Sequence, residues 1–111
     1  MLLAPRLEDD VEKHFTRLRR LEDRGEIGVG YSESWYSRLE ETLVGLQILA
    51  DRHSYAPERQ AWRRDVRNAL FFDYRILYHM VGDNVWAMRV RHQRQAQLRR
   101  PGPGTAYSPP R

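Results

Sequence analysis

The sequence predicts an α+β fold, in which a helical hairpin packs on a small antiparallel sheet and the element order is β-α-α-β-β-β. In the first half of the chain, apolar residues recur every three or four positions, as they do on one face of a helix. In the second half, short β-branched and aromatic segments are typical of strands. We expect one domain over 1–98, followed by a disordered, proline- and glycine-rich tail over 99–111.

The first half contains two expected helices. The first is expected over 8–24, and Gly25 is placed to end it. The second is expected to begin after Ser32 or Ser34, either of which can cap a helix N-terminus, and to end at about 52–53. Two helices joined by so short a connection form a hairpin.

The second half contains the expected strands. The segments 66–72, 74–81 and 85–91 have strand-like patterns, and 82–84 is a turn signal between the last two. Residues 2–4 are expected to add a short edge strand, the weakest of the four. The sheet is therefore expected to contain four strands.

The pairing of the last two strands follows from side-chain chemistry, because residues directly opposite each other share a face. A three-residue loop at 82–84 pairs His79 with Ala87 and separates apolar from charged side chains. A two-residue loop would pair His79 with Trp86 and mix the two faces, so the three-residue register is favoured. That register places on one face Ile76, Tyr78, Met80, Trp86, Met88 and Val90, and on the other Arg75, Leu77, His79, Arg89 and Arg91.

Composition excludes several classes of protein. The chain has no cysteine, which excludes disulfide scaffolds, thiolate metal sites and cysteine nucleophiles. His14 and His53 lack ligand-like spacing, so we expect no metal and no cofactor. No apolar run approaches the length of a membrane span, and no signal-peptide pattern is present, so we expect a cytoplasmic protein without a membrane role.

The second half is also the basic half of a chain whose net charge is +4. One face of the last two strands carries Arg75, Arg89 and Arg91 together with His79. Guanidinium groups bind phosphate and carboxylate with two hydrogen bonds, so this face suits a polyanion or an acidic peptide. A solvated strand face that pairs with the acidic helices is the alternative.

The predicted helical hairpin is followed by three motifs, Tyr74-Arg75-Ile76-Leu77-Tyr78, Gly82-Asp83 and Arg91-His92-Gln93-Arg94. In this order they resemble the C-terminal half of the RelE/ParE toxin superfamily. The segment 3–10 is similar to the strand-to-helix entry of that family. The resemblance covers about residues 2–98 and includes the order of the elements.

This resemblance implies the toxin of a bacterial type II toxin–antitoxin pair, of the kind also described as plasmid stabilisation proteins. Its partner would be a small acidic antitoxin, bound along the helical hairpin and the sheet in a toxin–antitoxin hetero-oligomer. The residues expected to contact the antitoxin or the target are Arg75, His79, Arg89, Arg91 and Arg94.

The family divides by mechanism. RelE-like members are endoribonucleases that cleave mRNA on the ribosome; here Arg67 and Arg75 would stabilise the phosphate, and His92 would act as acid or base. ParE-like members lack a recognisable catalytic set and inhibit DNA gyrase by binding. The ending His92-Gln93-Arg94-Gln95, with no nearby tyrosine, resembles the ParE-like branch, which we therefore favour. A basic binding module without toxicity is the third alternative.

Overall fold

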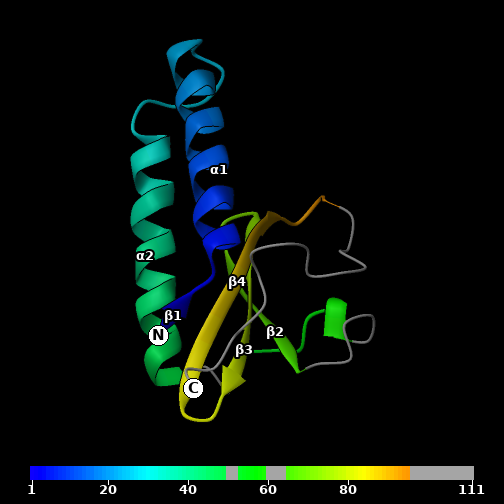
Figure 1. Ribbon diagram of the computed structural model, residues 1–111. Coiled ribbons are helices and arrows are strands. Elements are labelled where there is room, and N and C mark those ends of the chain that lie inside the picture. Colours follow the sequence, from blue (N-terminus) through cyan, green and yellow to red (C-terminus); the bar gives the residue numbers. More distant parts are fainter. Residues whose placement is uncertain (50–52, 60–64, 96–111) are drawn as a thin grey trace.

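The computed structural model describes residues 1–49, 53–59 and 65–95, so the expected tail over 99–111 lies outside the described residues. Its elements confirm the predicted α+β class and the predicted order (Figure 1). The helices are α1 (Pro5–Asp23) and α2 (Tyr31–Leu49). The strands are β1 (Leu2–Leu3), β2 (Val66–Phe71), β3 (Tyr74–Val81) and β4 (Asn84–His92).

The two helices lie side by side as a hairpin that packs on the sheet (Figure 1). Pro5 opens α1, where its missing N–H costs nothing and its fixed φ suits the first turn. The helix α2 begins at Tyr31, so the prediction that it follows Ser32 or Ser34 as the cap is wrong. Instead, a carboxylate oxygen of Glu22 in α1 accepts hydrogen bonds from the Ser32 backbone N–H at 2.8 Å and from its hydroxyl at 2.7 Å.

The hydrogen bond from the Ser32 hydroxyl has the larger effect and the one from the backbone N–H the smaller. Both lower the pKa of the Glu22 carboxyl below its ordinary value. A carboxylate in this position also complements the positive end of the helix dipole of α2. The cap therefore comes from the other helix of the hairpin, and it links the end of α1 to the beginning of α2.

The sheet has the strand order β1-β4-β3-β2. β3 is antiparallel to both of its neighbours, whereas β1 is parallel to β4. The prediction of an antiparallel sheet is therefore wrong for the first strand, and the sheet is mixed. The helical hairpin returns the chain to the end of the sheet where it began, so β2 runs in the direction of β1. Since β2 and β4 are both antiparallel to β3, β4 has that direction as well.

The pairing of β3 with β4 combines the two registers that the sequence offered. Near the turn His79 pairs with Trp86, as a two-residue loop requires, so the favoured register is wrong there. Farther from the turn Leu77 pairs with Arg89, as the three-residue loop requires. Met88 is the extra residue of a β-bulge that joins the two registers.

The bulge changes which side chains share a face. Trp86 and Met88, predicted to lie with Ile76, instead pack with Leu77 in a second, smaller core. Ala87, between them, belongs to the main core. The face prediction is thus wrong for Trp86 and Met88. The extra residue of the bulge shifts the pairing by one position between the turn and Arg89, so that these side chains point to the opposite sheet face.

The main core lies between the helical hairpin and the sheet, where Trp35 of α2 packs against Phe71 and Tyr74 at ring distances of 5.7 Å and 5.3 Å. The second core lies on the opposite sheet face, which we call the open face, and includes Ala56 from the segment 53–59. Within the described residues, no helix has both the length and the apolar character needed to cross a membrane.

Candidate functional site

Three arginines of the hairpin β3–β4 project from the open face. Arg75 is directly opposite Arg91, and Leu77, which belongs to the core of that face, is directly opposite Arg89. The structure therefore brings together the arginines that the sequence placed on one face. Both Arg75 and Arg89 are buried, each with only 6% of its surface exposed.

Arg75 is held by a carboxylate that no sequence pattern indicated. Its two terminal nitrogens donate to the two carboxylate oxygens of Glu58, both at 2.6 Å, and Glu58 is fully buried. This two-bond geometry is the strongest form of an arginine–carboxylate pair. The only sequence signal for Glu58 is a single acidic residue within an arginine-rich stretch.

The segment 53–59 carries Glu58 to the sheet. It runs along the outer edge of β2, where the Ala56 N–H donates to the Val66 carbonyl at 2.8 Å and the Asn68 N–H donates to the Ser54 carbonyl at 3.0 Å. Ala56 is buried in the second core. The segment is thus fixed by backbone hydrogen bonds and by packing, and it covers part of the open face.

Arg89 is held by Asp10 of α1. Its Nε donates to Oδ2 of Asp10 at 2.6 Å and its Nη2 donates to Oδ1 at 3.1 Å. Asp10 is also buried, so the pair is removed from solvent. No local sequence pattern relates Asp10, which lies in the second turn of α1, to β4.

Arg91 lies beside these two ion pairs and is half-buried. Burial lowers the pKa of its guanidinium, and the neighbouring positive charges of Arg89 and Arg75 lower it further. An arginine nevertheless keeps its proton at physiological pH. The carboxylates of Asp10 and Glu58 act in the opposite direction and raise this pKa.

The three candidate nuclease residues are not brought together. Arg75 lies on the open face, whereas Arg67 is directly opposite Tyr78 and His92 is directly opposite Tyr74, both of the main core. Arg67 and His92 therefore lie on the sheet face that packs against the helical hairpin, opposite to the open face. Tyr78 and Tyr74 are four residues apart on β3, which separates Arg67 from His92 by about 13 Å along the strand direction.

Each of these two residues has its own local contacts. Arg67 donates to the His53 carbonyl at 2.8 Å and to the Tyr55 hydroxyl at 3.2 Å. His92 packs its ring edge-on against Tyr74 at 5.0 Å, and its Nδ1 accepts a hydrogen bond from the Arg94 N–H at 3.0 Å. The contacts of Arg67 are typical of a packed side chain, and those of His92 are typical of a residue beside a turn.

The remaining binding candidates are His79 and Arg94. His79 is half-buried on the open face, between Val66 and Trp86 of the neighbouring strands. Arg94 follows the end of β4 and is exposed. Of the five binding candidates, Arg94 is therefore the most accessible, and Arg91 is the next among the arginines.

This arrangement suits binding better than catalysis. A ligand at Arg75 or Arg89 would have to displace Glu58 or Asp10, whereas Arg94 is exposed and Arg91 is half-buried. In the described part of the chain, no group of three His, Asp or Glu side chains is arranged to hold a metal ion. No family model matches the sequence, and no curated protein is significantly similar to it.

Proposed function

We propose that this chain is the toxin of a type II toxin–antitoxin pair and that it acts by binding a macromolecular target, as ParE-like toxins do. The observation that carries the choice of mechanism is the separation of Arg67, Arg75 and His92 over two sheet faces. A ribonuclease needs its acid, its base and its phosphate-binding cations within hydrogen-bond reach of one phosphodiester. By analogy with the ParE-like branch, the target would be DNA gyrase.

The toxin assignment itself rests on the resemblance of the motifs and on the order of the elements. The α+β architecture, with a helical hairpin on one face of a small sheet, supports it. The exposed Arg94 and the half-buried Arg91 are the cations that an acidic antitoxin segment would contact, since opposite charges steer association and fix orientation. This contact would neutralise the toxin by covering the same surface.

The test is inducible expression in a bacterial host, alone and together with the neighbouring gene, with DNA synthesis and protein synthesis followed separately. We expect DNA synthesis to stop first, with intact mRNA, and the purified chain to inhibit DNA supercoiling by gyrase. His92→Ala should leave this toxicity intact. Prompt mRNA cleavage with loss of protein synthesis would instead support the RelE-like alternative, and normal growth would support the non-toxic binding module.

Charge reversal locates the binding surface. Arg91→Glu with Arg94→Glu should reduce toxicity and weaken antitoxin binding. The matched control is Arg24→Glu with Arg38→Glu, which changes the net charge equally at exposed positions of the helical hairpin. Unfolding of each variant by urea shows whether the fold is retained, and equal toxicity of the two double variants would exclude Arg91 and Arg94 as the binding surface.

A further inference from the structure

The helical hairpin carries two hollows that follow each other along α2. The first, with a volume of about 340 Å³, lies between α1 and α2 and is formed mostly by apolar side chains, among them Val11, Phe15 and Leu43. The second, of about 380 Å³, lies where the end of α2 meets the turn between β3 and β4. The N-terminal residues connect them, because Leu3 lines the first and Met1 lines the second.

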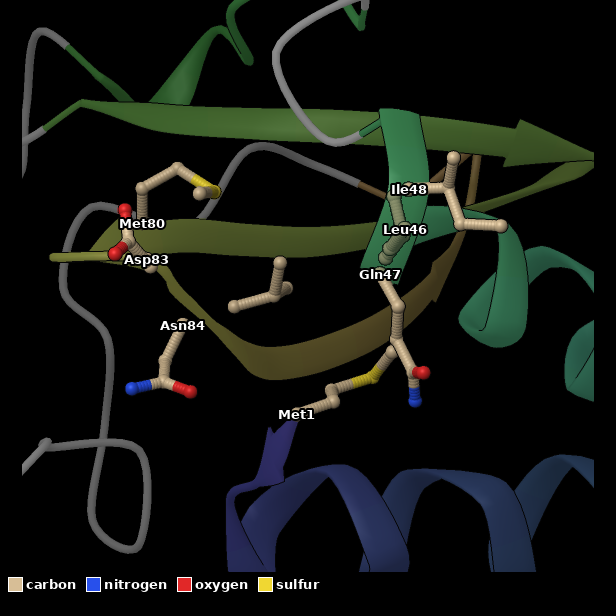
Figure 2. A pocket seen from close by; sticks show the side chains of 8 residues that line it. Met1, Leu46, Gln47, Ile48, Met80, Asp83 and Asn84 are labelled. Atoms are coloured by element: carbon tan, nitrogen blue, oxygen red, sulfur yellow. The ribbon is translucent and has the colours of Figure 1, made fainter.

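Figure 2 shows the second hollow. Its apolar side chains include Met1, Ile48 and Met80, and the polar side chains of Gln47, Asp83 and Asn84 also line it. Three elements that are distant in the sequence thus meet around it. We call the two hollows together, with the adjoining surface of α2, the apolar strip.

Exposed apolar side chains of α2 extend this strip. Tyr36, Val44 and Ile48 have 43%, 59% and 77% of their surface exposed, although all three lie on one helix. Single exposed apolar residues are common, but several on one helix beside a hollow formed mostly by apolar side chains are typical of an interaction surface. From Tyr36 to Ile48 the helix rises by about 18 Å, which matches about three turns of a second helix.

The charged side chains that line the two hollows have one sign. The charged residues that line the two hollows are Glu8, Glu12, Glu40 and Asp83. All four are acidic, in a chain whose net charge is +4. Within the described residues none of these carboxylates forms an ion pair, so their charge is available to a partner.

This charge pattern decides between occupants. In a symmetric dimer the same patch faces itself, so a second copy would bring carboxylates against carboxylates. An acidic segment, as expected for an antitoxin at Arg91 and Arg94, would meet the same repulsion here. A partner with positive charges beside its apolar face would gain apolar contacts with the strip and ion pairs with these carboxylates.

We propose that the apolar strip binds an amphipathic helix of a protein partner, with Lys or Arg residues flanking the apolar face of that helix. Its apolar side chains would enter the groove between α1 and α2, in the helix-in-groove mode of recognition. Its cations would pair with Glu8, Glu12 and Glu40 at the rim of the first hollow. The apolar strip is separate from the surface of Arg91 and Arg94, and the inference does not depend on toxicity.

The probe is a labelled peptide helix of about 18 residues, built from Leu, Ala and Lys, and a second peptide of the same design with Glu in place of Lys. We expect fluorescence anisotropy with the full chain to show saturable binding of the basic peptide only. Glu8→Lys, Glu12→Lys and Glu40→Lys combined should weaken it at least about tenfold. Val44→Ser with Ile48→Ser should weaken it without any change in charge.

The matched control combines Asp23→Lys, Glu26→Lys and Asp65→Lys, three exposed acidic residues away from the two hollows and from the exposed apolar residues of α2. It changes the net charge equally and should leave binding nearly unchanged. Equal weakening by both triple variants would reveal non-specific charge attraction and overturn the proposal. A dimer in sedimentation that Val44→Ser with Ile48→Ser dissociates would also overturn it, because a second copy would then be the occupant.

Discussion

Asp10 of α1 and Arg89 of β4 form a buried ion pair with two hydrogen bonds, although 79 residues separate them in the sequence. The same carboxylate accepts the backbone N–H of Val90 at 3.1 Å. β1 pairs with β4 only as far as Ala87, so beyond it the edge of β4 has no neighbouring strand. The carboxylate of Asp10 therefore satisfies a backbone donor that a longer β1 would have paired.

His14, one helical turn after Asp10, completes this edge. Its Nε2 lies 3.2 Å from the Val90 carbonyl, so α1 contacts both polar backbone groups of one residue in β4. Residues four apart lie on the same face of a helix, which lets both side chains reach the strand. This contact positions α1 along β4, with Asp10 beside Arg89.

Removing the carboxylate of Asp10 is expected to destabilise the chain strongly. Asp10→Ala leaves the guanidinium of Arg89 buried without its partner, and we expect the free energy of unfolding to fall by about 3–5 kcal/mol in urea denaturation. Asp9→Ala, at the exposed neighbouring position, should change it by less than about 0.5 kcal/mol. Asp10→Leu with Arg89→Met should lose less than Asp10→Ala, and similar effects of Asp9→Ala and Asp10→Ala would contradict a stabilising role of the carboxylate.

The pair between Arg75 and Glu58 is expected to require the planar guanidinium. Arg75→Lys keeps the charge but cannot make two parallel hydrogen bonds to one carboxylate, so we expect a loss of about 1–3 kcal/mol in the free energy of unfolding. Arg59→Lys, at an exposed position next to Glu58, should cost less than about 0.5 kcal/mol. If thermal and urea unfolding give the same stability for both variants, the two-bond geometry contributes nothing.

The stability of the chain is expected to decrease in mild acid because of His14. Burial lowers the pKa of this side chain below its ordinary value of 6.5; Arg17 and His92 also lower it, whereas the Val90 carbonyl and Asp10 raise it. As the pH falls below 6.5, the unfolded chain therefore takes up a proton before folded His14 does, and stability is lost until the pH passes the pKa of the folded state.

The measurement compares urea unfolding at about pH 7.5 and about pH 5.5 for the parent chain and His14→Gln. The variant should lose less stability between these two pH values, although it is less stable than the parent at the higher one. An unchanged pH dependence in the variant would exclude His14 as the titrating group.

Gly82 is expected to be required by the turn between β3 and β4. Its φ is +61°, a conformation that strains any residue with a Cβ, and no atom lies within 4 Å of the position that a Cβ would take. Gly82→Ala should therefore lower the free energy of unfolding by about 1 kcal/mol through backbone strain alone. Gly28→Ala is the control, since that position has equal space and no positive φ, and a similar loss there would contradict the explanation.

Sequence patterns predicted the elements well because each pattern is local. The helical spacing of apolar residues indicated a helix over 8–24, and α1 covers Pro5–Asp23. The turn signal around Gly82 and Asp83 correctly separated two strands. The face prediction held for Arg75 and Leu77, whose pairing lies beyond the bulge, and it failed for Trp86, which lies between the bulge and the turn.

The candidate site was predictable only in part. The sequence identified Arg75, Arg89 and Arg91 as one face, because alternation along a strand is a local property. It gave no indication of Glu58, which reaches Arg75 across 17 residues of sequence from an irregular segment. The burial of that pair, and with it the loss of Arg75 as a free anion-binding group, could not be read from composition.

By itself the sequence determined the two helices, the three main strands and the basic side of the last hairpin, since hydrophobic period and turn chemistry act over a few residues. The tertiary structure decided the parallel pairing of β1, the bulge at Met88 and the ion pairs of Arg75 and Arg89. These features depend on which surfaces meet after the chain has folded. A buried charge takes the nearest carboxylate that packing brings to it, and no spacing along the chain specifies that distance.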